Sequence, residues 1–516
     1  MSKPLLLAAG ILLSTAATAQ QPNSSFAGPD PTAAPDGVVI QTWTQITGND
    51  SSTHELTGFG RFIVASTKGQ KACDAFTVTT SDTKATPTIT ARTNAAPKQF
   101  PITVCEFKFD QSWTSASLYS GGKPVGLYLG SAWARFPTLY SVGSRTPDQI
   151  SMVSIGDSGC RNNRDQQCGS FEWPFQAIAE KAATLKPDVV LHLGDYRYAN
   201  KNSNDNWYLW YQELFYPAQR LLLESPWITV RGNHERCGYD NFTAVDAPWG
   251  TGWNLFLQPL DAASSLQCPA NITNGTADPT GYQPPYTVDI EPWYPFSDGD
   301  YSNRFVILDT SSNTDITSLQ TNFTTSIGGT YQKENVWWAS HRPIWGVNPY
   351  PPVTSEDNNL DESLTSAMNA YGYGPVDPCW TEEYLPCTLR TVISGHIHNL
   401  EQVQFFWGGT GKDADNWQRP MQYVSGNSGV VLNPVMNTSP CTFTLPQSDA
   451  KKYGANLTAT VDWENHHGFT FWQRGQGFYG QSGWQETRYL YDGGNWATKV
   501  PQDVSSTSSS TTCASY

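Results

Sequence analysis

The pattern of apolar and polar positions changes character near residue 148. From residue 20 to 147, short runs in which apolar and polar residues alternate, such as 75–79 and 102–107, are typical of half-buried strands, and helical periodicity is scarce. We therefore expect a β-rich N-terminal domain over residues 20–147, ending in a linker at 144–148.

Beyond this point, continuous apolar runs alternate with amphipathic stretches. The runs, each as long as a buried strand, are 150–156, 188–194, 226–232, 304–309, 335–340, 391–395 and 421–426. Between the first three runs, residues 172–185 and 206–223 have the periodicity of helices. This alternation predicts an α/β fold with parallel strands, in a domain that we place at residues 148–435.

The remaining segments are less regular. Residues 240–300 and 345–385 are rich in Pro, Gly, Trp and Asn and lack periodicity, so we expect long surface excursions there. Residues 436–504 are again β-like and aromatic, which predicts a β-rich C-terminal extension, and residues 505–516 form a Ser/Thr-rich tail.

The N-terminus has the features of a secretion signal. Lys3 precedes an apolar run at residues 5–13, and the small residues 17–19 form a cleavage site. The run is shorter than the roughly 20 residues that span a bilayer, although an uncleaved anchor is the alternative. We expect residues 1–19 to be a signal peptide and the protein to be secreted, either extracellular or periplasmic.

The cysteines and the glycosylation sequons agree with an oxidising compartment. The chain has ten cysteines, none in Cys-x-x-Cys spacing, which favours disulfides over a zinc site. Near neighbours along the chain are Cys73 with Cys105, Cys160 with Cys168, Cys237 with Cys268, and Cys379 with Cys387, which leaves Cys441 and Cys513. The sequons, which are compatible with glycosylation, are at Asn23, Asn49, Asn241, Asn271, Asn274, Asn322, Asn437 and Asn456.

Residues of types that commonly bind metals come immediately after five of the expected strands. They are Asp157, Asp195, Asn233, His341 and His396, and a glycine precedes most of them. Ligands of α/β folds collect at the carboxyl ends of parallel strands, so we expect these residues to converge at one edge of the sheet. Mixed oxygen and nitrogen donors suit a pair of transition-metal ions, which together clamp a phosphoryl oxygen and activate water.

The order of these motifs resembles the calcineurin-like metallophosphoesterase superfamily. The blocks Asp-x-Gly, Gly-Asp-x-x-Tyr, Gly-Asn-His-Glu, a lone histidine and Gly-His-x-His occur in that order within residues 149–430. Tyr198, three residues after Asp195, is similar to the tyrosine of the purple acid phosphatases, and Gly159 stands where other branches usually have a histidine. The resemblance implies that the α/β domain is a two-sheet αββα sandwich.

The resemblance also implies a role for each matching residue. The implied ligands of a first metal ion, Fe(III), are Asp157, Tyr198 and His398. Those of a second ion, a divalent Fe, Zn or Mn, are Asn233, His341 and His396. Asp195 is expected to bridge both ions, and His234 to hold the phosphate and help protonate the leaving group. The implied nucleophile is a metal-bound hydroxide, with no covalent phosphoenzyme.

We therefore expect a secreted phosphohydrolase that cleaves phosphomonoesters to alcohol and inorganic phosphate. A phosphodiesterase or nucleotidase on the same site is the first alternative, because loops rather than the fold set the substrate. A secreted binding protein with a degenerate site is the second. The net charge of −15 argues against nucleic acid as the main partner, but it does not exclude a small phosphorylated substrate.

Alternatives also remain for single residues. The alternative for Tyr198 is a core tyrosine with a bonded hydroxyl, whereas Tyr196, two residues earlier, is expected to point the other way. His192, inside a strand, is expected to be a core histidine or to support a ligand. Arg231 and Glu235 flank the Asn-His pair and are candidates for supporting roles.

One departure from the family pattern affects substrate specificity. Large purple acid phosphatases often have further histidines shortly after the lone metal-binding histidine, but residues 344–353 contain none. Tyr350 or an aromatic wall is the expected substitute.

Overall fold

The computed structural model describes most of the chain between residues 28 and 500. The described residues are 28–53, 55–83, 85–128, 130, 132–140, 142, 150–161, 166–169, 172–198, 205–237, 250–264, 266–268, 283–290, 303–311, 316–330, 335–344, 348–349, 352–353, 389–407, 421–433, 440–444, 457–474 and 484–500. The expected signal peptide, the linker at 144–148, Tyr350 and the Ser/Thr-rich tail lie outside them.

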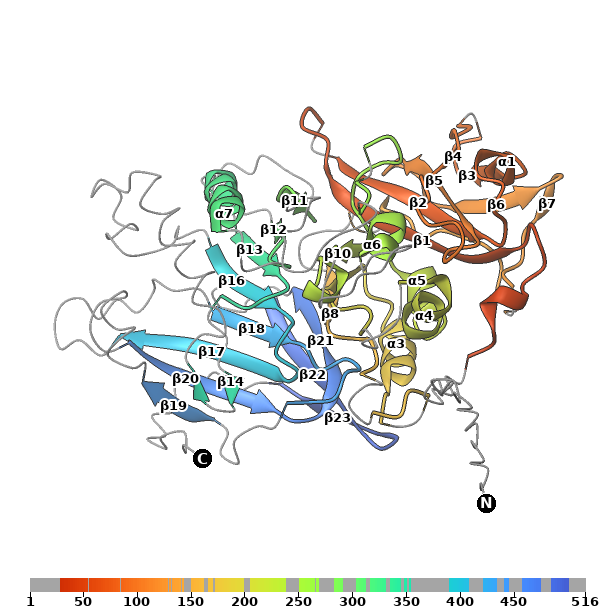
Figure 1. The fold of residues 1–516 in the computed structure, drawn as a ribbon. Coiled ribbons are helices and arrows are strands. Elements are labelled where there is room, and N and C mark those ends of the chain that lie inside the picture. Colours follow the sequence, from red (N-terminus) through yellow and green to blue (C-terminus); the bar gives the residue numbers. More distant parts are fainter. Residues whose placement is uncertain are drawn as a thin grey trace, which may run out of the picture.

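Two large sheets contain most strands of the α/β domain (Figure 1). In the first, β8 (Ser151–Ile155), β9 (Val189–His192) and β10 (Trp227–Thr229) are parallel neighbours. In the second, the parallel neighbours are β12 (Asn303–Leu308), β13 (Asn335–Ser340), β16 (Leu389–Ser394) and β18 (Met421–Ser425). These are the seven apolar runs of the sequence, so the predicted α/β fold with a two-sheet sandwich is confirmed.

Alternate residues of the central strands face two different cores. Leu191 of β9 and Ile228 of β10 pack between the sheets, where they join Phe305 and Trp337 of the second sheet. Val190, between Val189 and Leu191, points to the opposite face and packs against helices. Because both faces of these strands are covered, the strands are apolar throughout instead of alternating.

Helices cover the outer face of each sheet. On the first sheet lie α3 (Phe175–Thr184), α4 (Trp207–Trp210), a π-helical turn η4 (Tyr211–Phe215) and α5 (Gln219–Glu224). On the second lies α7 (Ile316–Thr330), whose Phe323 ring packs 5.9 Å from that of Trp338 in β13. The single helix expected at 206–223 is therefore three consecutive pieces, because the π turn and Pro217 interrupt its hydrogen-bond ladder.

The N-terminal strands extend the first sheet. β1 (Val39–Asn49), β2 (Leu56–Val64), β5 (Thr103–Phe109) and β4 (Thr90–Ala91) follow one another, and β1 pairs with β10 in parallel. A separate small sheet contains β3 (Thr77–Thr80), β6 (Ala116–Ser120) and β7 (Lys123–Pro124). The N-terminal region is β-rich as expected, but its largest sheet continues into the α/β domain.

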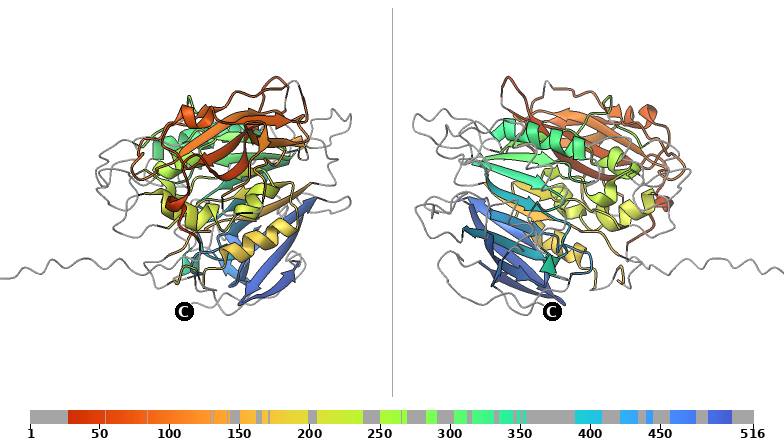
Figure 2. Two further views of the ribbon diagram at one scale, coloured as in Figure 1. Left: turned by 90° about the vertical axis from the view of Figure 1, so that its right-hand side faces the viewer. Right: turned by 60° about the vertical axis from the view of Figure 1, so that its left-hand side comes forward.

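The C-terminal strands, drawn in cyan to blue in Figure 2, are divided between both sheets. β21 (His467–Arg474), β22 (Trp484–Asp492) and β23 (Asn495–Lys499) continue the first sheet beyond β8. β17 (Leu400–Trp407), β20 (Leu457–Glu464) and β19 (Cys441–Thr444) continue the second beyond β18. Strands from both the N-terminal and the C-terminal region therefore belong to the sheets of the sandwich.

The other elements are short. They are η1 (Pro31–Ala33), α1 (Gln70–Cys73), η5 (Asn233–Glu235), α6 (Thr251–Phe256), β11 (Tyr286–Asp289), β14 (Asn348–Pro349) and β15 (Pro352–Val353). Among the residues that the structure describes, no helix combines the length and the apolar character needed to cross a bilayer.

Three of the expected disulfides are formed. They join Cys73 to Cys105, Cys160 to Cys168, and Cys237 to Cys268. Cys441 is also disulfide-bonded, whereas Cys379, Cys387 and Cys513 lie outside the described residues.

Two of the eight sequons lie in the described part of the chain. Asn322 is 7% exposed within α7, so a glycan there would not fit the folded protein. The Asn49 side chain bonds the backbone of Asp289 through both its amide nitrogen and its oxygen. Glycosylation at the other sequons stays a prediction.

Candidate metal centre

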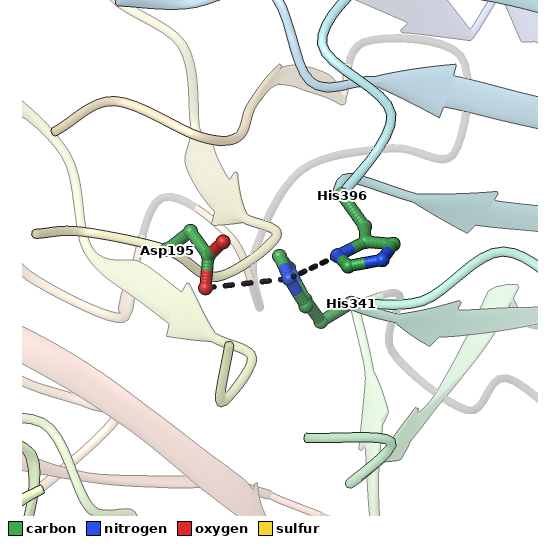
Figure 3. A group of neighbouring side chains, drawn as sticks. All are labelled: Asp195, His341 and His396. Atoms are coloured by element: carbon green, nitrogen blue, oxygen red, sulfur yellow. Dashed lines mark hydrogen bonds and ion pairs between the residues drawn. The ribbon is translucent and has the colours of Figure 1, made fainter. Parts of the chain in front are cut away.

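The carboxyl ends of both sheets meet at one place. Asp157, Asp195 and Asn233 follow β8, β9 and β10 of the first sheet, while His341 and His396 follow β13 and β16 of the second. Figure 3 shows Asp195, His341 and His396 pointing toward one another, and their ligand atoms all lie within 4.8 Å of one another. The residues that the sequence predicted to converge therefore lie together, in a cluster with members from both sheets.

The backbone at these strand ends has an uncommon conformation. Asp157 and Asp195 both have φ of 53°, and His396 has φ of 71°, in the left-handed region that residues other than glycine rarely adopt. Such strain persists only where the surrounding structure imposes it, and it is concentrated at functional sites. The residues turn sharply out of their strands, which brings the side chains of different strands together.

The glycines before these residues permit the close approach. A Cβ atom on Gly395 would lie 2.5 Å from Oδ2 of Asp157, and one on Gly194 would lie 2.6 Å from Nδ1 of His341. Gly194 itself has φ of 94°, a conformation that favours glycine. Any larger residue at either position would push two of the predicted ligands apart.

The first group of predicted ligands is built around Tyr198. Its hydroxyl donates to Oδ1 of Asp157 at 2.6 Å and lies 3.0 Å from Nε2 of His398. Nε2 of His398 is in turn 3.5 Å from the same oxygen of Asp157. By contrast, the Tyr196 hydroxyl donates to the carbonyl oxygens of His192 and Val230 in the core, so the two tyrosines point in opposite directions as expected.

The second group surrounds the fully buried ring of His341. Its Nε2 lies 2.8 Å from Oδ1 of Asn233, 3.3 Å from Oδ1 of Asp195 and 3.3 Å from Nδ1 of His396. The other ring nitrogen, Nδ1, donates to the carbonyl oxygen of Leu193 at 2.8 Å, which fixes the ring and leaves Nε2 directed at the cluster.

The electrostatics of the cluster favour positive charge inside it. Burial alone would lower the pKa of His341, but Asp195 and Asp157 raise it to about 9. Burial would likewise raise the pKa of Asp195, yet the charge of His341 holds it well below its usual range. The buried carboxylates thus stabilise a cation among imidazole, amide and phenol donors, and this donor set fits two transition-metal ions.

The loop of Tyr198 is held by a residue that sequence reasoning missed. Oε2 of Glu213, in the π-helical turn, accepts hydrogen bonds from the backbone N–H groups of Cys160 at 2.9 Å and Tyr198 at 3.0 Å. No motif marks Glu213, because it reads as an ordinary residue of an amphipathic helix. It fixes the Asp157 and Tyr198 loops relative to each other.

Gly159 has no room for the histidine that other branches have at this position. Its Cβ would lie 2.7 Å from Cα of Arg197, 2.9 Å from Oε2 of Glu213 and 2.9 Å from Cδ2 of Tyr198. A glycine at 159 and a tyrosine at 198 are therefore two parts of the same local packing.

Glu235 performs the corresponding role beside Asp195. Its two carboxylate oxygens accept from the backbone N–H groups of Asp195, Tyr196 and Gly232 at 2.9 to 3.0 Å. Arg231 donates to the backbone oxygen of Glu235 and lies 3.5 Å from Asp309. The supporting positions expected for both residues thus correspond to direct contacts around the ligands.

His192 is buried beneath the residues that support the ligands. Its Nε2 is 2.9 Å from Oγ of Ser158, and its ring stacks on Tyr196 with ring centres 3.8 Å apart. It lies outside the donor cluster and supports the chain on either side of it, in agreement with the expectation of a core or supporting histidine.

Three cationic or imidazole groups border the cluster. His234 is 8% exposed, with Nε2 3.9 Å from Oδ2 of Asp195, and burial lowers its pKa to about 3, so the ring is neutral. The guanidinium of Arg161 lies 5.0 Å above the Tyr198 ring, and that of Arg342 lies 3.0 Å from Nε2 of His396. The sequence analysis did not predict a role for either arginine. The only signal in the sequence is that each arginine lies near a predicted ligand.

Comparison with known proteins agrees with this geometry. Residues 152–400 match the family model described as calcineurin-like phosphoesterase. The part of the chain that carries the cluster therefore belongs to the calcineurin-like phosphoesterase family. No curated protein sequence matches the chain.

One solved structure shows the same fold at low sequence identity, and two others are less similar. A purple acid phosphatase from yellow lupin (Lupinus luteus) seeds has a TM-score of 0.52 at 12% identity, over 90% of this chain and 74% of that chain. PhoD has a TM-score of 0.47 at 9% identity, over 92% of this chain and 90% of that chain. A dimetal phosphatase from Danio rerio has a TM-score of 0.33 at 12% identity, over 69% of this chain and 100% of that chain.

Proposed function

We propose that the protein is a secreted phosphomonoesterase with two metal ions. The observation that carries this proposal is the buried cluster itself, in which donors from both sheets lie within contact distance of one another. The family match supports phosphoester chemistry in general terms. The disulfides support an oxidising compartment and therefore secretion.

The proposed ligands form two sets that share one carboxylate. Asp157, Tyr198 and His398 would hold an Fe(III) ion. Asn233, His341 and His396 would hold a divalent Fe, Zn or Mn ion. Asp195 would be shared by both sets. Bound ions of this kind neutralise the charge of a phosphoryl group and activate water for attack on phosphorus.

The protein residues have defined tasks around the substrate. His234 borders the cluster as a buried imidazole whose Nε2 lies 3.9 Å from Oδ2 of Asp195, and its proposed role is to hold the phosphate and help protonate the leaving group. Glu213 and Glu235 keep the ligand loops in place through backbone hydrogen bonds. The substrate is thus positioned by a site that is largely formed before it binds.

The test is the Asp195→Ala variant, because Asp195 is the proposed bridge. It should lose metal and at least about 100-fold of the activity on an aryl phosphate, since even supporting residues of metal sites contribute 10- to 100-fold. The exposed Asp74 provides the control, and Asp74→Ala should retain both metal and rate. Unchanged hydrolysis by Asp195→Ala would exclude the two-metal mechanism.

A substrate panel separates the proposed reaction from its alternatives. Rates on monoesters, diesters and nucleotides with matched leaving groups should be highest for the monoesters. A preference for diesters or nucleotides would replace the proposed substrate class while leaving the metal site intact. Metal binding without turnover of any ester would favour a binding protein.

A further inference from the structure

Arg161 is held in place at the border of the metal centre. Its guanidinium lies 5.0 Å above the ring of Tyr198, the ring whose hydroxyl contacts Asp157 and His398. The Tyr198 ring also lies 4.3 Å from the ring of His234, measured between centres. The ring of Tyr198, a proposed ligand, therefore contacts both Arg161 and the proposed proton donor His234.

The base of the Arg161 side chain is fixed by three contacts. The Cys160–Cys168 disulfide closes the loop that contains it, and the backbone N–H of Arg161 donates to Oε1 of Gln166 at 2.8 Å. The preceding residue, Cys160, donates its backbone N–H to Glu213. A guanidinium on an anchored backbone loses less conformational entropy when it binds a ligand.

Arg161 differs from the buried arginines in its ion pairing. Arg61, Arg197 and Arg488 each lie within ion-pair distance of a buried carboxylate, Glu106, Asp205 and Asp462 respectively. For Arg161, no carboxylate of the described residues lies within 4.0 Å of the guanidinium, whose recorded neighbour is the Tyr198 ring. It is therefore a cation at the border of the site whose hydrogen-bond donors remain available to an anion.

We propose that Arg161 binds a non-bridging oxygen of the substrate phosphoryl group and thereby selects phosphomonoesters over phosphodiesters. This inference rests on the proposed phosphoester hydrolysis and assigns one determinant of its substrate class. A monoester dianion has one more negative charge and one more terminal oxygen than a diester, so a planar guanidinium stabilises it more. The proposed role also supplies donors in place of the histidines that segment 344–353 lacks.

Two substitutions separate charge from packing. Arg161→Met keeps a long side chain over Tyr198 but removes the charge and the donors, whereas Arg161→Lys keeps the charge without the planar fork. Arg135 provides the control, because its side chain is 58% exposed and lies on the N-terminal region. Metal content and melting temperature of each variant show whether the site and the fold are intact.

The measurements are kcat/KM for 4-nitrophenyl phosphate and methyl 4-nitrophenyl phosphate, and the inhibition constant of inorganic phosphate. Arg161→Met should raise the monoester KM and the phosphate inhibition constant by about 10- to 100-fold, the usual contribution of a charged hydrogen bond. Its diester kcat/KM should change by a smaller factor, so the monoester-to-diester ratio falls. Arg161→Lys should lie between Arg161→Met and the unchanged protein, and Arg135→Met should match the unchanged protein.

An unchanged monoester-to-diester ratio together with an unchanged phosphate inhibition constant in Arg161→Met overturns the inference, even if the overall rate falls through lost packing. If Arg161→Met loses metal or stability, the same two quantities in Arg161→Lys decide. If the unsubstituted protein with metal bound hydrolyses neither ester, the proposed function fails instead. Calorimetric measurement of inorganic phosphate binding to the unsubstituted protein and to Arg161→Met then still tests whether Arg161 binds phosphate.

Discussion

The two sheets contribute to the candidate metal centre in different ways. On the first sheet, dedicated buried carboxylates hold the loops, with Glu213 bonding the Tyr198 backbone and Glu235 bonding that of Asp195. On the second sheet, the backbone N–H of His396 donates to Oδ2 of Asp157, a residue of the first sheet, at 2.7 Å. The first sheet is thus the frame of the site, and the loops of the second sheet are positioned against it.

The largest effect should come from removing the carboxylate beside Asp195. Glu235→Ala leaves three buried backbone N–H groups without their acceptor. We expect the free energy of unfolding to fall by about 3 kcal/mol or more, since each buried unsatisfied donor costs about 1–3 kcal/mol. Chemical denaturation and metal analysis measure the two consequences.

The control for this change is Glu180→Ala on the exposed face of α3, which should leave both quantities unchanged. If Glu235→Ala is as stable as the control and retains both metals, the first sheet does not act as the frame.

The next effect concerns the space at Gly159. Gly159→Ala places a Cβ 2.7 Å from Cα of Arg197, which is backbone and cannot rotate away. We expect about 1–3 kcal/mol of destabilisation, as for other overpacked positions, and a displaced Tyr198 ring. Thermal melts and the Tyr198-dependent spectrum report the change.

Gly126 offers a matched comparison, because an added Cβ there meets nothing within 4 Å. Gly126→Ala should therefore melt like the unsubstituted protein. Equal melting temperatures for the two alanine variants would contradict the link between Gly159 and Tyr198.

The smallest effect should come from Glu213→Gln, which keeps the shape of the side chain. Both bonded N–H groups contact the same oxygen of Glu213, so an amide oxygen can still accept from them, but without the carboxylate charge. Stability should fall by about 1 kcal/mol, the typical net contribution of a buried hydrogen bond.

Metal analysis adds a sharper criterion to Glu213→Gln, with Glu180→Gln as its control. Because the hydrogen bonds of Glu213 go to the Cys160 and Tyr198 backbone and its ion pair goes to Arg197 beside Tyr198, Fe(III) content should fall more than divalent metal content. Equal loss of both ions would show that the two halves of the site are not separately supported.

The sequence predicted the strands and the strand-end residues because both signals are local. Continuous apolar runs mark strands that are covered on both faces, and Asp157 or His396 comes directly after such a run. The parallel pairing of β1 with β10 escaped prediction, since it joins Gln45 to Trp227 across a long stretch of chain. Periodicity contains no information on which distant strand becomes a neighbour.

The supporting residues escaped prediction for a similar reason. Glu213 acts through a π-helical turn that departs from regular helix geometry, and apolar periodicity does not report such a departure. Arg161 owes its position to contact with the Tyr198 ring in the folded chain. The opposite directions of Tyr196 and Tyr198 do not follow from their spacing, because residues two apart in an extended segment share a face. The chain leaves the extended conformation at Asp195, where φ is 53°.

The central claim is that Tyr198 and its neighbours hold ferric iron beside a divalent metal. The most direct measurement is the visible absorption spectrum of the purified protein, together with its metal content, before and after Tyr198→Phe. We expect a phenolate-to-iron charge-transfer band in the unsubstituted protein that vanishes in Tyr198→Phe. A colourless and fully active protein that contains only divalent metal would contradict the claim.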